Sequence, residues 1–174
     1  MSTESKRILV AFATRYGSTR EVAEAVAAAL GEKGFQATLR PARKAGDWNG
    51  YDALVVGAPL YLGSWHKEAL RLLADRQEAA RARPVAVFAL GPLHDEAGER
   101  EAARVQLRKA LDGLRLEPVA VEVFCGKYDP ARLRLGDRLL AGLPASPLHG
   151  LPASDARDWT AIRSWARELA GRLR

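Results

Sequence analysis

The sequence of 174 residues contains a single cysteine, Cys125, and this scarcity limits both the chemistry and the compartment. One thiol cannot form an internal disulfide, which is typical of proteins in the reducing cytoplasm. The three histidines, His66, His94 and His149, lack the spacing that zinc ligands require. We therefore expect a cytoplasmic protein without a metal centre.

Long hydrophobic runs are also missing. No apolar stretch approaches the roughly 20 residues of a membrane-spanning helix, and residues 1–7 contain no apolar signal segment. Hydrophobic residues nevertheless make up 48% of the sequence and charged residues 28%, which indicates a globular protein. This length predicts a single domain over residues 1–174, with one buried core.

Acidic residues are outnumbered, because 27 lysines and arginines stand against 21 aspartates and glutamates, giving a formal charge of +6. This excess favours anionic partners, namely nucleic acid, an anionic membrane surface or an acidic small molecule. Nucleic-acid modules combine basic clusters with exposed aromatics, whereas the arginines here lie beside glutamates along helical stretches. We therefore expect no nucleic-acid partner.

Apolar runs of strand length alternate with amphipathic runs of helix length along the whole chain. Strands are expected at residues 7–14, 36–40, 53–58, 85–90 and 119–124, and helices at 19–33, 65–81, 99–114 and 159–173. This alternation predicts an α/β fold, in which helices cover both faces of a parallel sheet. Five strands in a doubly wound sheet favour the order 2-1-3-4-5, with ligands bound beyond the carboxyl ends of the strands.

The first strand leads into a loop that is rich in hydroxyl groups. Thr14, Ser18 and Thr19 lie at the carboxyl end of the strand, and Ser18 and Thr19 occupy positions typical of helix N-caps. Hydroxyls and free backbone N–H groups at the start of a helix form a site for phosphate. The alternative is an ordinary capped helix that binds no ligand.

The same loop lacks the glycine patterns of common nucleotide sites. Gly17 is its only glycine, so it contains neither G-x-G-x-x-G nor a Walker loop ending in Gly-Lys-Ser/Thr. Hydroxyls in place of glycines suit a phosphate monoester, which needs side-chain donors, better than a pyrophosphate, which needs close backbone approach. Residues 14–19 are therefore predicted to bind a phosphate monoester.

Two further loops follow the third and fourth strands and are expected to line the same site. In one of them, Tyr61 or Trp65 is able to stack on a flat conjugated ring, and core packing is the alternative for both aromatics. The other has a Gly-Pro turn whose backbone donors suit the polar edge of such a ring. The candidate residues of these loops are Pro59, Leu60, Tyr61, Leu62, Gly63, Leu90, Gly91, Pro92 and Leu93.

Residues from about 126 to 158 are predicted to form an insertion before the last helix. An unstructured connection of this length is usually functional or disordered. Its leucines alternate with Arg132, Arg134 and Arg138, which is typical of a basic amphipathic element that lies on a membrane or covers a hydrophobic substrate. The alternative is a surface element whose leucines pack on the sheet edge.

Cys125 is the remaining candidate for catalysis, because it ends the fifth strand. A phosphatase loop requires Cys-x5-Arg, but the arginine here is Arg132, one residue too late. The chain also lacks the G-x-S-x-G elbow of serine hydrolases. We therefore expect Cys125 to be a small buried residue.

Together these motifs resemble a flavodoxin-like FMN-binding family, most closely the menaquinone-dependent protoporphyrinogen oxidases of bacteria. The similarity covers almost the whole chain and lies in the motifs Thr14–Thr19, Gly57–Glu68, Leu90–Leu93 and Arg157–Ala166. It implies noncovalent FMN, with its ring between the second and third loops. Its phosphate would lie on Thr14, Arg15, Tyr16, Gly17, Ser18 and Thr19.

The resemblance also implies an activity, which is the transfer of electrons from a planar substrate such as a porphyrinogen to a quinone, in heme biosynthesis. No catalytic side chain is implied, because the flavin supplies the redox chemistry. The insertion would contact substrate or membrane, which implies a peripheral position at the inner membrane face. A soluble electron-transfer flavodoxin is the alternative, although the basic charge disfavours it, and a fold that has lost its flavin is a third. The sequence leaves the oligomeric state open.

Overall fold

The structure is a computed structural model that describes residues 5–174. Its central sheet contains five parallel strands, which lie in the spatial order β2-β1-β3-β5-β6 and confirm the predicted 2-1-3-4-5 topology. The α/β flavodoxin-like fold expected from the sequence is therefore present. The bounds of the strands are β1 (Arg7–Phe12), β2 (Gln36–Pro41), β3 (Ala53–Tyr61), β5 (Val85–Leu90) and β6 (Ala120–Phe124).

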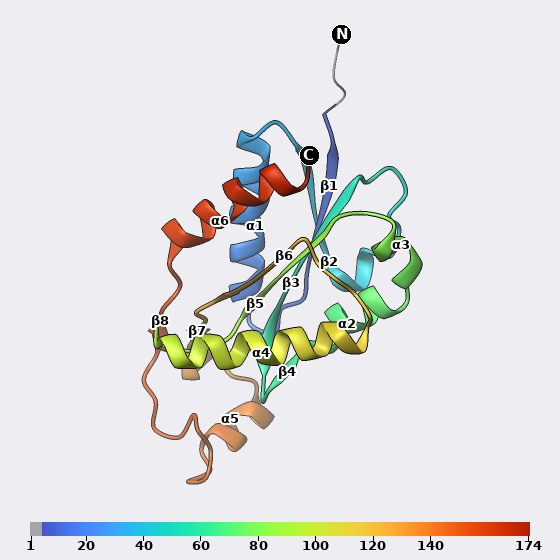
Figure 1. The fold of residues 1–174 in the computed structure, drawn as a ribbon. Coiled ribbons are helices and arrows are strands. Elements are labelled where there is room, and N and C mark those ends of the chain that lie inside the picture. Colours follow the sequence, from blue (N-terminus) through green and yellow to red (C-terminus); the bar gives the residue numbers. More distant parts are fainter. Residues whose placement is uncertain (1–4) are drawn as a thin grey trace.

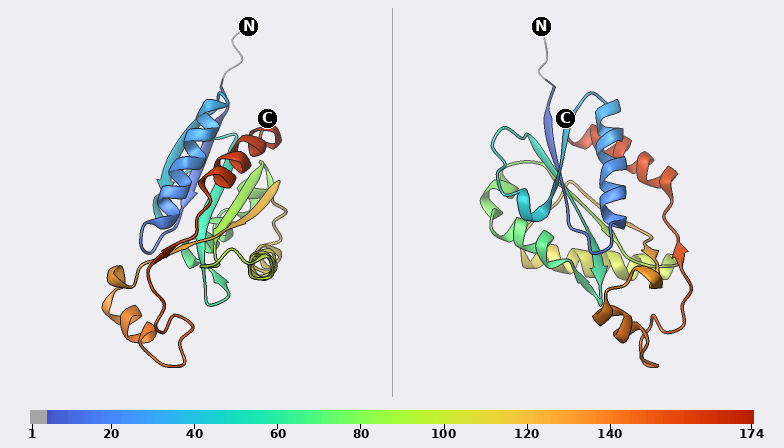
Figure 2. Two further views of the ribbon diagram at one scale, coloured as in Figure 1. Left: turned by 90° about the vertical axis from the view of Figure 1, so that its left-hand side faces the viewer. Right: turned by 180° about the vertical axis from the view of Figure 1, so that it is seen from behind.

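Helices cover both faces of this sheet (Figure 1). One face packs against α1 and α6, which lie side by side, and the other packs against α2, α3 and α4 (Figure 2). The helices are α1 (Ser18–Glu32), α2 (Lys67–Ala74), α3 (Gln77–Arg81), α4 (Ala97–Gly113) and α6 (Trp159–Arg172), with a short 3-10 helix η1 at Ala42–Lys44.

The core on the α1 and α6 face is organised around one aromatic cluster. The rings of Phe88, Phe124 and Trp165 lie 5.7–6.0 Å apart between centroids, in tilted or edge-on arrangements that aromatic pairs favour. Phe88 lies directly over Gly57 of β3, where any side chain would collide with its ring. A glycine at this position therefore allows the aromatic cluster to join α6 to the sheet.

The predicted loop at residues 59–65 is instead a β-hairpin. β3 continues to Tyr61, and β4 (Ser64–Trp65) returns antiparallel to it. Leu62 and Gly63 have φ values of 47° and 78°, so they form the two-residue turn with positive φ that matches the twist of a hairpin. The prediction missed this turn because leucine rarely adopts such a conformation.

Trp65 belongs to the core, not to the ligand site. Its ring is 2% exposed, and its Nε1 donates to the carbonyl oxygen of Ala58 at 3.1 Å. The predicted helix at residues 65–81 is also wrong in detail, because β4 occupies its start and a break at Asp75 and Arg76 separates α2 from α3. The core-packing alternative for Trp65 is therefore the one that the structure supports.

The insertion at about residues 126–158 contains regular elements. Two short strands, β7 (Lys127–Tyr128) and β8 (Ser154–Asp155), pair antiparallel at its base. Between them lie the 3-10 helix η2 (Pro130–Arg132) and α5 (Leu135–Ala141), and α5 lies beyond the carboxyl ends of the strands (Figure 1). The insertion therefore folds over the carboxyl-terminal ends of the strands, where ligands are expected.

The leucines of the insertion are mostly exposed. Leu135, Leu139, Leu140 and Leu143 are 75%, 68%, 62% and 53% exposed, so they do not pack on the sheet edge as one alternative proposed. Within residues 5–174, none of the helices combines the length and the hydropathy needed to cross a membrane. α5 is thus a short helix with an unusually apolar outer surface.

Candidate functional site

A cavity of about 400 Å³ lies where the predicted loops meet, beyond the carboxyl ends of β3 and β5. Its walls are mainly apolar, which is typical of small-molecule sites in α/β folds. All three predicted loops contribute to it. The predicted site residues that line it are Tyr16, Ser18, Pro59, Leu60, Tyr61, Leu62, Leu90, Gly91 and Leu93.

The insertion forms the rest of the wall, and the sequence did not identify these residues individually. The Pro/Leu/Arg composition indicated a functional segment, but no motif showed which side chains face a ligand. The structure adds Gly126, Lys127, Tyr128, Asp129, Arg132, Leu133, Asp137, Leu140, Ala141, Ser146, Pro147 and Leu148.

The other predicted residues do not line the cavity. Thr14, Arg15, Gly17 and Thr19 belong to the loop whose Tyr16 and Ser18 form part of the wall, and Gly63 and Pro92 belong to the other two loops. Within the loop, the Thr14 hydroxyl oxygen accepts from the Gly17 N–H at 2.9 Å. Of residues 14–19, Tyr16 and Ser18 thus border the cavity, while Thr14 holds the shape of the loop.

The cap of α1 differs from the prediction. Gly17 is the N-cap, with φ of 91°, and Ser18 is the first helical residue, so neither Ser18 nor Thr19 caps the helix. Glycine adopts this left-handed conformation without a steric penalty, which explains why it takes the cap position. Gly17 has no side chain with which to bind the free N–H groups of the first turn, which stay available to an anion.

Thr19 provides the fit test for a phosphate group. Its side chain is fully buried, and within residues 5–174 its Oγ1 has no hydrogen-bond partner. Buried hydroxyls normally have a partner, so an orphaned one at a helix start indicates a missing polar ligand. A phosphate oxygen has the chemistry to fill this role, and the residues of this loop therefore fit the FMN phosphate.

Asp137 of α5 connects the insertion to the predicted phosphate loop. Its carboxylate accepts from Arg15 Nε at 2.8 Å and from Arg15 Nη2 at 2.5 Å, and also from the Tyr16 hydroxyl. We call Asp137, Arg15 and Tyr16 the Asp137 clasp. The hydrogen bond from Tyr16, with that from Arg15, holds the pKa of Asp137 below its ordinary value. Since the two ends of the clasp are far apart in sequence, no local pattern predicts it.

Arg157 fixes the chain after β8 to the start of α1. Its side chain is only 3% exposed and donates to both carboxylate oxygens of Asp155, at 2.8 and 2.6 Å. It also donates to Glu21 at 2.6 Å and to the Ser18 carbonyl oxygen at 3.3 Å. Hydrogen bonding from Arg157 lowers the pKa of Asp155. Arg157 thereby holds the first turn of α1, which follows the predicted phosphate loop, against the chain after β8.

The histidine His94 and the cysteine Cys125, both considered in the sequence analysis, do not line this cavity. His94 is exposed, and its exposed neighbour Asp95 pairs with Arg100 at 2.9 Å. Cys125 is 6% exposed, and burial raises the pKa of its thiol, as suits a buried small residue. The described part of the chain holds no group of three or more side chains arranged as metal ligands.

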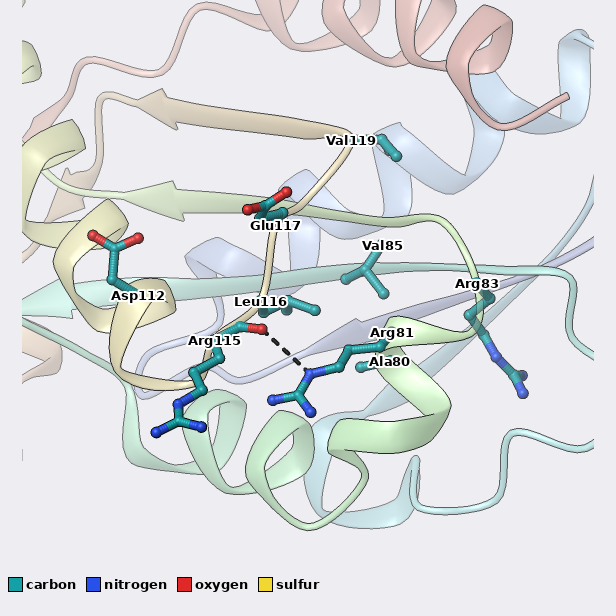
Figure 3. Close-up of a pocket in the computed structure, with 9 residues that line it drawn as sticks. All are labelled: Ala80, Arg81, Arg83, Val85, Asp112, Arg115, Leu116, Glu117 and Val119. Atoms are coloured by element: carbon teal, nitrogen blue, oxygen red, sulfur yellow. Dashed lines mark hydrogen bonds between the residues drawn. The ribbon is translucent and has the colours of Figure 1, made fainter.

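A second cavity, of about 450 Å³, lies at the opposite edge of the sheet, near the start of β5 (Figure 3). Arg81 and Arg115 both border it, and Arg81 donates to the Arg115 carbonyl oxygen at 3.3 Å. Arg83 is occupied by the carbonyl oxygens of Trp48 and Tyr51. None of the predicted site residues lines this cavity, so the cavity at the carboxyl ends is the candidate site.

Comparison with known families identifies the fold family. Residues 9–149 match the profile of the Flavodoxin domain. The chain belongs to the flavodoxin domain family. It is also similar to protoporphyrinogen IX dehydrogenase (quinone) of Escherichia coli, both in strain K12 and in strain O157:H7. The identity is 27% over 173 residues, covering 94% of each chain.

Solved structures agree with the flavodoxin assignment. A point mutant of flavodoxin from Pseudomonas aeruginosa superposes with a TM-score of 0.60 at 17% identity, covering 96% of this chain and 98% of the other. A WrbA-like flavodoxin from Agrobacterium tumefaciens gives a TM-score of 0.54 at 16% identity, covering 97% and 98%. At these identities the structural likeness supports the flavodoxin fold alone.

Proposed function

We propose that this flavodoxin-domain protein binds FMN and oxidises a porphyrinogen-like substrate with a quinone as electron acceptor. The observation that supports it most directly is the apolar cavity at the carboxyl ends of the strands, which is lined by Ser18, the neighbour in sequence of Thr19 with its buried and unpaired hydroxyl. The near full-length similarity to a quinone-dependent protoporphyrinogen dehydrogenase supports the substrate and the acceptor.

In this proposal, the phosphate of FMN binds residues 14–19 and its ring lies against Tyr61 and the 90–93 turn. FMN, when bound, supplies the two-electron chemistry, so the protein needs no acid or base of its own. Each cycle removes two electrons and two protons from the donor and delivers both to the quinone, which becomes a quinol. The chain's own residues bind and orient the reactants, and the insertion excludes water from the cavity.

A direct test measures both cofactor and reaction. The purified protein is titrated with FMN by calorimetry and then given protoporphyrinogen and a soluble menaquinone analogue without oxygen. We expect binding of one FMN and an FMN-dependent rise of protoporphyrin fluorescence. Absence of FMN binding would overturn the cofactor assignment, and FMN binding without porphyrin formation would overturn the substrate.

Electron transfer between proteins is the alternative function for this fold. The net charge of +6 argues against it, because flavodoxins that carry electrons usually present acidic docking faces to cationic partners. Rapid reduction of a cationic cytochrome by the dithionite-reduced holoprotein, without porphyrinogen oxidation, would favour this alternative.

We further propose a peripheral, cytoplasmic position at an anionic membrane. The support is the exposed stripe of Leu135, Leu139 and Leu143, spaced four residues apart beside Arg134 and Arg138. Co-sedimentation with vesicles that contain phosphatidylglycerol is expected, and it should weaken with phosphatidylcholine alone and in a Leu139→Ser variant. Equal sedimentation with both lipids would contradict the proposal.

A further inference from the structure

Two cations line the candidate cavity without partners. Lys127 of β7 is half-buried and Arg132 of η2 is exposed, and both side chains border the cavity. Among residues 5–174, neither side chain forms an ion pair or a hydrogen bond. A partly buried cation without a partner is unfavourable unless an anion reaches it. This argument applies to the half-buried Lys127, and the exposed Arg132 places a second positive charge on the same cavity wall, so the pair points to a negatively charged ligand.

The nearby carboxylates form no ion pair with these two cations among the described residues. Asp137 is held by Arg15 and Tyr16 in the clasp, and the Asp129 carboxylate accepts from the Ala131 N–H at 3.0 Å. Asp155 lies opposite Lys127 in the β7–β8 pair and attracts it at longer range, but the carboxylate oxygens of Asp155 are both bound by Arg157. The acidic groups around Lys127 and Arg132 thus have other partners.

Apolar side chains at the lip of the same cavity indicate the rest of the ligand. Leu62 at the hairpin turn is 94% exposed and Leu140 of α5 is 62% exposed, and both line the cavity. Exposed apolar surface at the rim of a cavity is typical of a binding site for a hydrophobic group. The site therefore combines apolar walls with two cations that have no ion-pair partner within residues 5–174.

We propose that Lys127 and Arg132 recognise the carboxylates of an apolar, ring-shaped substrate, while Leu62 and Leu140 cover its apolar surface. This inference rests on the proposed function, and it names the residues that distinguish a dicarboxylic ring from its neutral counterpart. Cations hold carboxylates by charge-assisted hydrogen bonds, which strengthen in a partly buried site. A neutral ester of the same ring lacks this interaction.

The test compares protoporphyrin IX, which has two propionate groups, with its dimethyl ester. Binding is measured by fluorescence titration of the protein as purified and after saturation with FMN. The wild-type protein is expected to bind the acid at least tenfold more tightly than the ester. Lys127→Gln and Arg132→Gln should each weaken binding of the acid by about tenfold, with binding of the ester and of FMN unchanged. The matched controls, Lys109→Gln and Arg108→Gln on exposed positions of α4, should bind like the wild type.

The outcomes separate this inference from the proposed function. Equal affinity for acid and ester, or equal losses for both ligands in the two variants, would overturn the carboxylate assignment even if FMN binds and the porphyrinogen is oxidised. Discrimination between acid and ester that disappears in both variants would support it, even if no FMN binds. In that last case the carboxylate assignment would be supported although the proposed FMN-dependent reaction would be ruled out.

Discussion

At the scale of single residues, Thr19 is expected to affect stability and binding in opposite directions. Thr19→Val removes a buried hydroxyl without a partner, so the free energy of unfolding of the FMN-free protein should stay level or rise by up to about 1 kcal/mol. The same change should weaken FMN binding by about 1.5–3 kcal/mol, because a hydrogen bond to a charged phosphate is lost. Urea unfolding and calorimetric titration measure the two effects.

Two further variants test the same phosphate site. Thr14→Ala should weaken FMN binding by a similar amount, on the order of 1.5–3 kcal/mol, whereas Thr38→Val in β2 should leave it unchanged. Unchanged FMN affinity in both Thr14→Ala and Thr19→Val would mean that the phosphate does not bind at residues 14–19.

Substitution of Gly57 by alanine adds only one methyl group, but it should destabilise the core strongly. Because Phe88 lies directly over it, Gly57→Ala forces the ring to move and should destabilise the fold by about 1–3 kcal/mol. Gly98→Ala is a suitable control, since nothing lies near a Cβ at this exposed helical position and alanine favours helices. Thermal unfolding of both variants checks this, and equal melting temperatures would contradict the packing argument.

At the scale of elements, the Asp137 clasp should stabilise α5 in a way that depends on pH. The folded protein lowers the pKa of Asp137, so this stabilisation is present above the ordinary value of about 4 and is lost as the pH falls through the lowered pKa. Asp137→Asn should therefore lower stability at pH 7 by about 0.5–1 kcal/mol, because the pair is partly exposed. The difference from the wild type should shrink towards pH 3.

The measurement combines urea unfolding at pH 7, 5 and 3 with tryptic cleavage at Arg134 and Arg138 at neutral pH. Faster cleavage of the variant would locate the effect in the insertion. Glu24→Gln, which breaks an exposed pair with Arg20 in α1, is the control and should change neither quantity measurably. A variant difference that persists undiminished at pH 3 would contradict the ionic role of Asp137.

The sequence predicts those elements whose pattern is local. β1, β3 and β5 were recognisable because buried parallel strands are apolar on both faces, and β6 because only Glu122 interrupts its apolar run. The end of α1 was recognisable because Gly34, which has a positive φ, follows Lys33. β4, β7 and β8 were not, since strands of two residues are defined only by their partners. The loops of the site followed from the topology, whereas its insertion wall depends on contacts such as Arg15 with Asp137 across the whole chain.

At the scale of the whole molecule, FMN binding should be visible as a shift in global stability. A ligand at a hundred times its dissociation constant stabilises the folded state by about 2.7 kcal/mol, which corresponds to roughly 5–10 °C for a chain of this size. Riboflavin, which lacks the phosphate, should give a much smaller shift at the same concentration. Equal shifts from both, read by differential scanning calorimetry, would mean that the ring alone is bound.

The antiparallel pairing of β7 with β8 brings the two ends of the insertion together. Tyr128 and Ser154 lie opposite one another in this pair, so residues 129–153 leave the β7–β8 pair and return to it at adjacent positions. Replacing residues 129–153 with a two-residue Asn-Gly turn between Tyr128 and Ser154 would remove most of the insertion and leave the order of the sheet strands unchanged. Grafting the same segment onto an unrelated flavodoxin at this strand pair would then test how much of the ligand preference the insertion carries without the rest of the cavity wall.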